Sequence, residues 1–419
     1  MTDILDDLTW RGLVAQTTDE QALRDALAAG PVTVYCGFDP TAPSLHFGNL
    51  VQLILLRHLQ RAGHKVIGLV GGSTGLIGDP RPTSERVLKT KEQTAQDVER
   101  IAAQVRRILT PEDGEPPLFV NNLDWTAPIS ALDFLRDYGK YFRVNQMIKK
   151  DAVAARLESE QGISYTEFAY QILQALDYLH LYREHGCTLQ TGAQDQWGNI
   201  TAGTDLVHRV EGGTAHALTT PLITDSQGRK FGKSEGNAVW LDPSMTSPFA
   251  FYQYWLNVED ASVVSLVKIF TDRTPDEVAE LERQVRDEPF RRAAQRLLAQ
   301  DVTTLVHGEA ATAQAQAASA ALFGKGDVRV LDAQTLADAT AEPARGAGAV
   351  GDTVVDALVA SGLVESRNAA RRAVADGAAS VNGEKVTDPE RVLTQEDFLH
   401  GSTALLRRGK KALAALRLG

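Results

Sequence analysis

Residues 35–50 read YCGFDPTAPSLHFGNL and lie between two runs of different character. The preceding residues 32–35, VTVY, are β-prone, whereas the following residues 50–61, LVQLILLRHLQR, are apolar at helical spacing. This pattern predicts a strand that turns directly into a helix. Gly48 lies near the helix start, where backbone N–H groups and the helix dipole favour a phosphate or an adenine ring. We predict a nucleotide site here, although His46 could equally serve only to cap the helix.

A second motif, KFGKS at residues 230–234, lies inside a glycine-spaced segment, residues 228–236. Lys230 and Lys233 are three residues apart between glycines that let the backbone move, so they form a positive clamp suited to a polyphosphate. The alternative is a solvated loop with no ligand.

The two motifs, in this order and one α/β domain apart, resemble the paired signatures of class I aminoacyl-tRNA synthetases. Essentially the whole chain resembles the tyrosyl-tRNA synthetase family, and four stretches carry that resemblance: YCGFDPTAPSLHFGN at 35–49, GGSTGLIGDP at 71–80, SYTEFAYQILQALDY at 164–178 and LQTGAQDQWGNITAG at 189–203. The chain departs from the family twice. Asn49 stands where a second histidine is usual, and KFGKS stands where KMSKS is usual. Because asparagine still donates a hydrogen bond, we interpret both departures as tuning.

Composition limits the classes of protein that fit this chain. Its 419 residues exceed one comfortable core, so two or three domains are expected, and 43% hydrophobic residues suffice for them. A net charge of −11 argues against coating nucleic acid through bulk electrostatics, so we expect only local RNA contacts and no DNA binding. Two cysteines indicate a reducing compartment. An acidic start and no membrane-length apolar run predict a cytoplasmic protein without a membrane partner.

The first half of the chain alternates between strand and helix patterns. Two amphipathic helices are expected within residues 3–30, outside the sheet. The alternation then predicts strands at 32–35, 65–70 and 118–120 and helices at 50–61 and 91–109. Such alternation favours an α/β fold with a Rossmann-like parallel sheet and right-handed crossovers, whose ligands bind at the carboxyl ends of the strands.

The resemblance also implies a domain order. It predicts a Rossmann-like catalytic domain at 1–245, an α-helical anticodon-binding domain at 246–323, a linker at 324–350 and a small α-L RNA-binding domain of the ribosomal-protein type at 351–419. Within the first domain, about residues 119–150 correspond to the interface of a homodimer. The aromatic residues of 247–258 are interpreted as core, and small, glycine-rich residues mark the linker.

Residues 352–419 contain ten Lys and Arg against nine Asp and Glu. Their net charge is therefore slightly positive, whereas the rest of the chain is acidic. Two basic clusters lie in this tail: Arg367, Arg371 and Arg372 on one helix face, and Arg407, Arg408, Lys410 and Lys411 near the end. We expect these clusters to hold an RNA backbone, which the resemblance identifies as tRNA(Tyr). A solvated basic helix is the alternative.

A predicted helix at 166–182 carries Tyr170, Gln174 and Asp177 at i, i+4 and i+7, so they share one face. A solvent-facing polar stripe would give the same spacing. The resemblance assigns all three residues to tyrosine binding, with Asp177 and Tyr35 on either side of the phenol hydroxyl. By the same resemblance, Asp79 on the glycine-rich loop takes the α-ammonium group and Gln196 orients the carboxylate; from the residues alone, Asp79 could be a turn residue. The resemblance assigns these six residues to the substrate: Tyr35, Asp79, Tyr170, Gln174, Asp177 and Gln196.

ATP is the implied co-substrate, accompanied by Mg²⁺, and the sequence shows no protein-bound metal cluster. The resemblance assigns ATP binding to Gly37, Asp39, Gly48, Gly192, Asp195 and Lys233. Asp195 would accept from the ribose hydroxyls, or alternatively would cap the helix that follows it. The implied catalytic residues are Thr41, His46, Asn49, Lys230, Lys233 and Ser234.

The implied reaction has two steps, in which ATP activates tyrosine as tyrosyl-adenylate and the tRNA 3′ end then takes the tyrosyl group. A tryptophanyl-tRNA synthetase shares the fold and both signatures, but Tyr35 and Asp177 suit a phenol hydroxyl better. A catalytically idle RNA-binding protein on the same scaffold is the alternative from another class, and the intact lysines and Asp79 argue against it.

Overall fold

The computed structural model describes residues 3–110, 116–224, 233–234, 237–324, 326–341, 344–409 and 412–419. The chain divides into two compact units, Met1–Met245 with Glu259–Phe290 and Thr246–Val258 with Arg291–Gly419. Among the described residues, no helix has the length and apolarity needed to cross a membrane.

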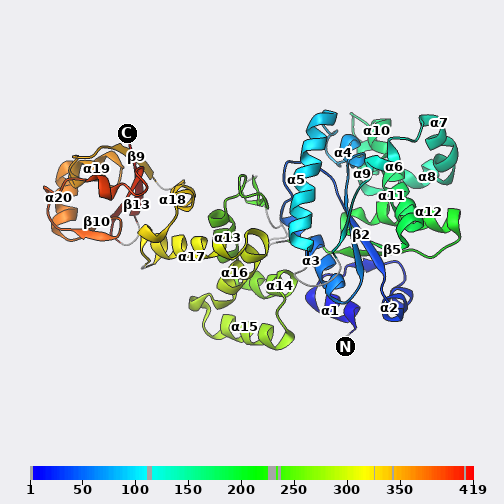
Figure 1. Ribbon diagram of the computed structural model, residues 1–419, viewed down its shortest axis with the longest axis horizontal. Helices are drawn as coiled ribbons and strands as arrows, with labels where there is room; N and C mark the ends of the chain where they lie inside the picture. The colour runs from blue at the N-terminus through cyan, green and yellow to red at the C-terminus, as the bar shows by residue number, and fades with distance from the viewer. Residues whose placement is uncertain are drawn as a thin grey trace. The chain divides into compact units, whose positions relative to one another are not determined.

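A six-stranded sheet forms the centre of the first unit, in the order β1-β6-β5-β2-β3-β4 (Figure 1). Five strands are mutually parallel: β2 (Thr33–Phe38), β3 (Lys65–Val70), β4 (Leu118–Asn121), β5 (Cys187–Ala193) and β6 (His216–Thr220). The edge strand β1 (Gln16–Thr17) is antiparallel to β6. The chain proceeds from β2 to β3 and β4 on one side, then continues at β5 on the other side of β2. The sheet therefore has its topological switch point between β2 and β5, where ligands bind in such folds.

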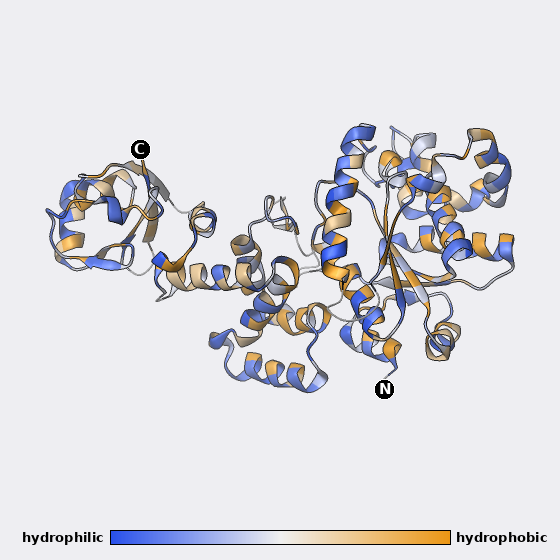
Figure 2. Ribbon diagram, in the orientation of Figure 1, coloured by the Kyte–Doolittle hydropathy of each residue, from blue (hydrophilic) through white to orange (hydrophobic). Residues whose placement is uncertain are grey.

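Helices cover both faces of this sheet, as expected for right-handed βαβ crossovers (Figure 1). One face carries α3 (Phe47–Arg61) and α5 (Lys91–Leu109), and the other carries α11 (Tyr170–His185) and α12 (Trp197–Glu211). Because both faces are covered, the central strands β2 and β3 are mostly apolar, which Figure 2 shows as orange ribbon in the middle of the unit. The predicted parallel α/β fold is confirmed.

The remaining elements of the first unit are mostly short. They are α1 (Ile4–Arg11), α2 (Glu20–Ala29), α4 (Thr74–Ile77), α6 (Leu123–Thr126), α7 (Ala131–Asp133), η1 (Phe134–Tyr138), η2 (Gly139–Tyr141), α8 (Val144–Met147), α9 (Asp151–Leu157), α10 (Tyr165–Phe168), η3 (Gln194–Gln196), β7 (Lys233–Ser234), β8 (Asn237–Ala238), α14 (Asp260–Phe270) and α15 (Pro275–Asp287). The helix predicted at 166–182 is divided at Ala169 into α10 and α11.

The helical stretch predicted at 246–323 is shared between the two units. Helices α14 and α15 group with the first unit. The Arg11 guanidinium of α1 donates to the backbone carbonyl oxygen of Thr271 over 2.9 Å, and the Phe47 and Phe270 rings lie 4.9 Å apart. These contacts join residues more than 200 positions apart, which local periodicity does not reveal.

The second unit begins with α13 (Pro248–Leu256), whose aromatic side chains Phe251 and Trp255 are completely buried, as the sequence favoured. This unit also contains η4 (Pro289–Arg291) in part, α16 (Ala293–His307), α17 (Glu309–Phe323), η5 (Val328–Val330), α18 (Ala333–Ala339), α19 (Val354–Ala360), α20 (Arg367–Ala375) and η6 (Gln395–Asp397).

A second sheet, in the order β11-β10-β12-β13-β9, ends the chain. Its strands are β9 (Ala344–Gly348), β10 (Ala379–Val381), β11 (Glu384–Val386), β12 (Thr403–Arg408) and β13 (Ala412–Leu418). Asn382 and Gly383 join β10 to β11 with φ of 48° and 86°. Positive φ at both residues matches the Asn-Gly hairpin turn, so β10 and β11 form a short hairpin beside α19 and α20.

The segment predicted as a linker at 324–350 contains η5, α18 and β9 instead of only irregular chain. Strand β9 pairs with β13 in parallel. A Cβ atom at Gly348 would lie 2.4 Å from Leu416 Cδ2, and one at Gly346 would lie 2.7 Å from the Ala360 carbonyl oxygen. Small residues are therefore needed here for close packing, although in the sequence the same composition indicates flexibility.

Candidate active site

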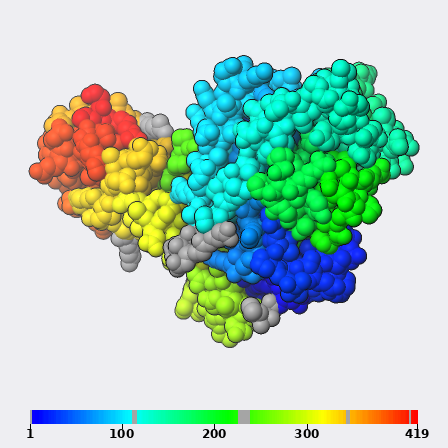
Figure 3. All heavy atoms as spheres, turned by 45° about the vertical axis from the view of Figure 1, so that its right-hand side comes forward, coloured from blue at the N-terminus to red at the C-terminus, as the bar shows by residue number. Residues whose placement is uncertain are grey.

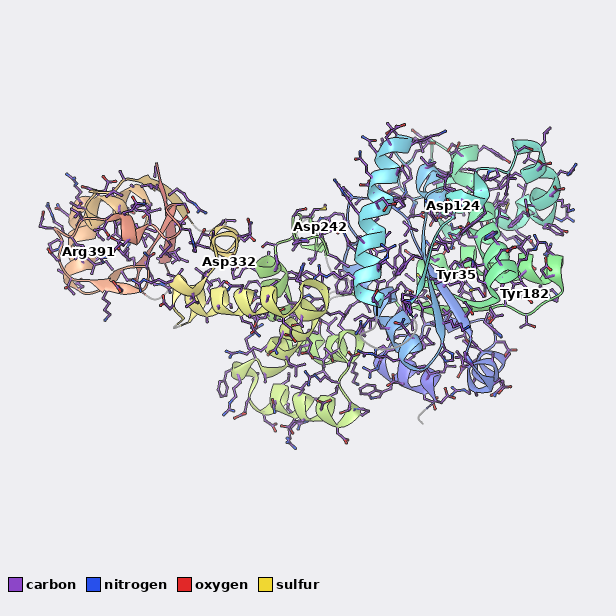
Figure 4. The ribbon with its side chains drawn as sticks, in the orientation of Figure 1. Tyr35, Asp124, Tyr182, Asp242, Asp332 and Arg391 are labelled. Atoms are coloured by element: carbon purple, nitrogen blue, oxygen red, sulfur yellow. The ribbon has the colours of Figure 1, made fainter. Side chains whose placement is uncertain are left out.

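A cavity of about 380 Å³ lies at the carboxyl ends of β2 and β5, beside the start of α3 and one face of α11. Its lining includes every predicted site residue whose side chain the structure describes: Tyr35, Gly37, Asp39, Thr41, His46, Gly48, Asn49, Asp79, Tyr170, Gln174, Asp177, Gly192, Asp195 and Gln196. Lys230 lies outside the described residues, and only the backbone of Lys233 and Ser234 is described. Figure 4 labels Tyr35 on the central strand β2.

The first motif builds the N-terminus of α3. The backbone N–H of Gly48 donates to His46 Nδ1 over 2.9 Å, and the backbone N–H of His46 donates to Asn49 Oδ1 over 3.1 Å. This reciprocal capping box starts the helix three residues earlier than predicted. It also gives Asn49 a structural role, because its amide oxygen accepts from the His46 backbone N–H.

The backbone brings the neighbourhoods of the two signature motifs together. His46 forms an antiparallel bridge with Trp240, and the N–H of Phe47 donates to the Val239 carbonyl over 3.0 Å. Just before this bridge, β8 pairs with β7, the strand formed by Lys233 and Ser234. Ala238 of β8 itself lines the cavity. The end of the lysine motif is thus anchored beside the first motif.

Tyr35 and Asp177 are buried at the cavity and are 1% and 2% exposed. The Asp177 carboxylate accepts from Asn122 Nδ2 and from Trp125 Nε1, each over 2.9 Å. Burial raises the pKa of Asp177 to about 8, and these two donors partly oppose the rise. The Tyr35 hydroxyl has no hydrogen-bond partner among the described residues. Burial raises its pKa, and the Asp177 charge raises it further, so the two groups are electrostatically coupled.

A second carboxylate at the cavity, that of the half-buried Asp39, is already hydrogen-bonded. Thr74 Oγ1 donates to one of its oxygens over 2.6 Å, and the Tyr170 hydroxyl donates to the other over 2.7 Å. Burial raises the pKa of Asp39 to about 6 despite these donors. Tyr170 and Asp177 are both buried, so the solvent-facing alternative for this helix face is wrong.

Asp79 is the centre of a small polar network. Lys150 Nζ donates to Asp79 Oδ1 over 2.7 Å, and Gln196 Nε2 donates to Asp79 Oδ2 over 2.9 Å. Asn199 Nδ2 donates both to Asp79 Oδ1 and to Gln196 Oε1. A lysine thus pairs with the carboxylate predicted to take an ammonium group. Asp195 makes no side-chain cap for α12, because the N-cap position belongs to Gln196.

Sequence reasoning missed four polar residues of this site. Asn122 and Trp125 hold Asp177, Lys150 pairs with Asp79, and Arg86 lines the cavity. All four lie outside the quoted family stretches. The loop that carries Arg86 directly follows GGSTGLIGDP. A basic residue so soon after Asp79 was the sequence signal that could have identified Arg86 as a site residue. Among the described residues, no group of three or more His, Cys, Asp or Glu could hold a metal ion.

Comparison with known proteins gives two family matches. The family model described as tRNA synthetases class I (W and Y) matches residues 27–324. A second model, the tyrosine–tRNA ligase SYY-like C-terminal domain, matches residues 341–416. The second match begins inside the segment that the sequence predicted as a linker, in agreement with the place of β9 in the C-terminal sheet.

Curated relatives extend over the whole chain. A tyrosine–tRNA ligase of Leifsonia xyli is 59% identical over 99% of this chain and 94% of its own length. One of Streptomyces coelicolor is 57% identical over 100% of this chain and 99% of its own. Among solved structures, a C-terminally truncated mitochondrial tyrosyl-tRNA synthetase of Coccidioides posadasii is 30% identical, with a TM-score of 0.67, over 75% of this chain and 91% of its own. The family-model match over residues 27–324 and these full-length relatives show that the chain, with its cavity at the β2–β5 switch point, belongs to the tyrosine–tRNA ligase family of class I tRNA synthetases.

Proposed function

We propose that this cavity carries out the tyrosine–tRNA ligase reaction, and that Tyr35 and Asp177 recognise the phenol hydroxyl of tyrosine. The buried Tyr35 hydroxyl, which has no partner among the described residues, is the observation that carries this proposal. A buried polar group without a partner is costly. A substrate hydroxyl can accept from Tyr35 and donate to Asp177, so it would satisfy both groups. An indole N–H can only donate, and a phenyl ring can do neither.

The other end of tyrosine would lie against Asp79, Tyr170, Gln174 and Gln196. Gln174 Oε1 is buried without a partner among the described residues, so it is available to accept from the ammonium group. Asp79 and Asp39 are electrostatically coupled, because the Asp79 charge contributes to the raised pKa of Asp39. An ammonium group bound near both would be attracted by two carboxylates.

ATP would bind along the first motif, on the same side of the sheet. A Cβ atom at Gly37 would meet only Leu69, at an ordinary 3.7 Å, so protein packing does not require glycine at this exposed position. A nucleotide resting on the strand would require it. We assign the ribose to Asp195 and Gly192, and the phosphates to Thr41, His46 and the lysine motif. Mg²⁺ would enter with ATP, held by its phosphates.

Catalysis at this site would rest on positioning and charge. The tyrosine carboxylate is already an anion, so its attack on the α-phosphorus requires no general base. Charge grows on the departing pyrophosphate, where Lys230, Lys233 and Arg86 would stabilise it. The tRNA 3′-terminal ribose would then take the tyrosyl group from the adenylate.

Homodimer formation is part of the proposal, through about residues 119–150. This segment exposes several large apolar side chains in a single chain: Leu123, Leu132, Leu135, Val144 and Ile148. Figure 3 shows it, in the blue-green part of the colour scale, on the outer surface of the first unit. Exposed apolar side chains in this number indicate a protein interface. Sedimentation at micromolar concentration should give the mass of two chains, and a monomer mass would contradict the proposal.

We also propose that the second unit binds tRNA and that the protein acts in the cytoplasm, where charged tRNA is used. In the C-terminal sheet domain, Arg371 and Arg372 of α20 are exposed and available to phosphates. In the second basic cluster, Arg407 and Arg408 differ from the expectation because both donate to backbone carbonyls, and Lys410 and Lys411 lie outside the described residues. Arg407 donates to the carbonyl oxygens of Ala321 and Leu322 at the end of α17. Its guanidinium therefore supports the fold.

The test of the proposed function is amino-acid-dependent ATP–pyrophosphate exchange, measured with each of the twenty standard amino acids. Exchange should occur with tyrosine alone, followed by charging of tRNA(Tyr). Equal exchange with tryptophan or phenylalanine would contradict the tyrosine assignment, and no exchange with any amino acid would leave a binding protein on the synthetase fold.

A further inference from the structure

A fully buried ion pair lies close to the site but outside the cavity lining. The Arg156 guanidinium of α9 donates to Glu167 Oε2 of α10 over 2.9 Å. Their side chains are only 2% and 1% exposed. Removing two charges from water is expensive, and a buried ion pair often adds little net stability compared with apolar side chains of similar size. The pair therefore calls for an explanation other than stability.

Both partners of the pair also hold one loop, residues 81–86. The backbone N–H of Arg86 donates to Glu167 Oε1 over 2.7 Å, and Arg156 Nη1 donates to the Arg81 carbonyl over 3.4 Å. The loop itself has little burial of its own, and Val87 directly after it is 94% exposed. The loop conformation is thus fixed by hydrogen bonds to two buried charged side chains, those of Arg156 and Glu167.

This loop determines where the Arg86 guanidinium lies. Arg86 Nε donates to the Asp79 carbonyl over 2.9 Å, and the side chain lines the cavity. It also covers Gly78, where a Cβ atom would come within 2.9 Å of Arg86 Cγ. The chain just after the loop is held as well, because Lys89 Nζ donates to the Pro40 carbonyl in the first motif and to Asp97 Oδ2.

We infer that Arg156 and Glu167 are positioning residues for the Arg86 guanidinium, which they hold toward the phosphates of ATP through the backbone of residues 81–86. The inference rests on the proposed function. A guanidinium fixed before ATP binds stabilises the growing pyrophosphate charge without reorganising during the reaction. If residues 81–86 were mobile, the guanidinium would no longer be placed in advance for ATP. The tyrosine side of the cavity would remain intact.

A double-mutant cycle on the full chain tests this. The variants are Glu167→Gln, Arg86→Gln and the two combined, with ATP–pyrophosphate exchange measured at saturating tyrosine and tyrosine affinity measured separately by calorimetry. Glu167→Gln should lower kcat/KM for ATP by about tenfold or more while the Kd for tyrosine changes by less than about twofold. In the Arg86→Gln background the same change should cost almost nothing further, because its target is gone.

The matched control is Glu211→Gln, the same chemical change in an exposed ion pair that joins Arg183 of α11 to the end of α12. It should leave exchange unchanged. If Glu167→Gln does not fold, the pair can be removed together as Arg156→Met/Glu167→Gln, which leaves no single buried charge.

Two results would overturn the inference in a chain whose unmodified form exchanges with tyrosine. One is that Glu167→Gln lowers kcat/KM for ATP by the same factor in the unmodified chain and in the Arg86→Gln background. The other is a loss of tyrosine affinity as large as the loss in the ATP step. Absence of exchange in the unmodified chain would instead contradict the proposed function.

Discussion

Asp177→Ala is expected to remove most of the discrimination between tyrosine and phenylalanine in ATP–pyrophosphate exchange. Phenylalanine lacks the phenol hydroxyl. When it binds in the intact cavity, neither the Tyr35 hydroxyl nor the Asp177 carboxyl gains a hydrogen bond from the substrate. The intact discrimination should be on the order of 10⁴ to 10⁵, the range established for sites that hydrogen-bond a substrate hydroxyl, of which tyrosyl-tRNA synthetases are the known example. Without Asp177 the tyrosine hydroxyl loses its acceptor, so kcat/KM for tyrosine should fall steeply while that for phenylalanine changes little.

The measurement is kcat/KM in exchange for both amino acids, on the same preparations. Tyr35→Phe is the matched control, because it removes one hydroxyl and keeps the ring that packs edge-on against Tyr178 at 5.3 Å. Its effect should be smaller, since it removes a neutral partner from the substrate hydroxyl, whereas Asp177→Ala removes the carboxyl group. Asp177→Ala also strips Asn122 and Trp125 of their acceptor, so thermal unfolding must accompany the kinetics. Unchanged discrimination in a folded Asp177→Ala chain would contradict the assignment of the phenol site.

The parallel sheet and its motif-bearing ends could be predicted because the evidence for them is local. The turn between the β-prone run and the apolar helix contains the turn-forming residues Gly37, Pro40, Pro43 and Gly48. The sequence alone therefore predicts it. Helix α5 (Lys91–Leu109) has the bounds that its periodicity predicted. Its N-cap Thr90 and Gln93 form a capping box, which is also a local signal.

What the sequence did not reveal depends on contacts between distant positions. Lys150 pairs with Asp79 across 71 positions, from a segment that the resemblance linked only to a dimer interface. Asn122 reaches Asp177 across 55 positions. No spacing rule connects such residues, because the sheet order, with β5 beside β2, brings them together. The glycines of β9 were misleading for the opposite reason, since tight packing and flexibility both favour small residues.

The structure also changes how the C-terminal domain should be removed in an experiment. A cut at 352, the start of the tail in the sequence, would leave β9 without its partner β13. Leu405 and Ala415 of the C-terminal sheet pack in one apolar cluster with Leu322 of α17 and Leu336 of α18. The better truncated chain therefore ends at 324, after α17, so that η5, α18 and the whole sheet are removed together.

Deletion of residues 325–419 is expected to abolish nearly all charging of tRNA(Tyr), by on the order of 10² or more, while exchange with tyrosine survives. The cavity lies wholly in the first unit, which keeps its sheet and both signature motifs. The removed phosphate contacts supply affinity and salt dependence together. Both reactions should be measured at two salt concentrations, with the full chain and with Arg371→Ala/Arg372→Ala as a variant that keeps the fold. That variant should weaken charging less than the deletion does, and should lower the salt slope by about 0.7 to 0.9 for each phosphate that is no longer neutralised.

Charging by the deleted chain at the full rate would exclude the domain from tRNA binding. Loss of exchange would instead show that the first unit depends on it, because no residue of the tyrosine or ATP site is removed.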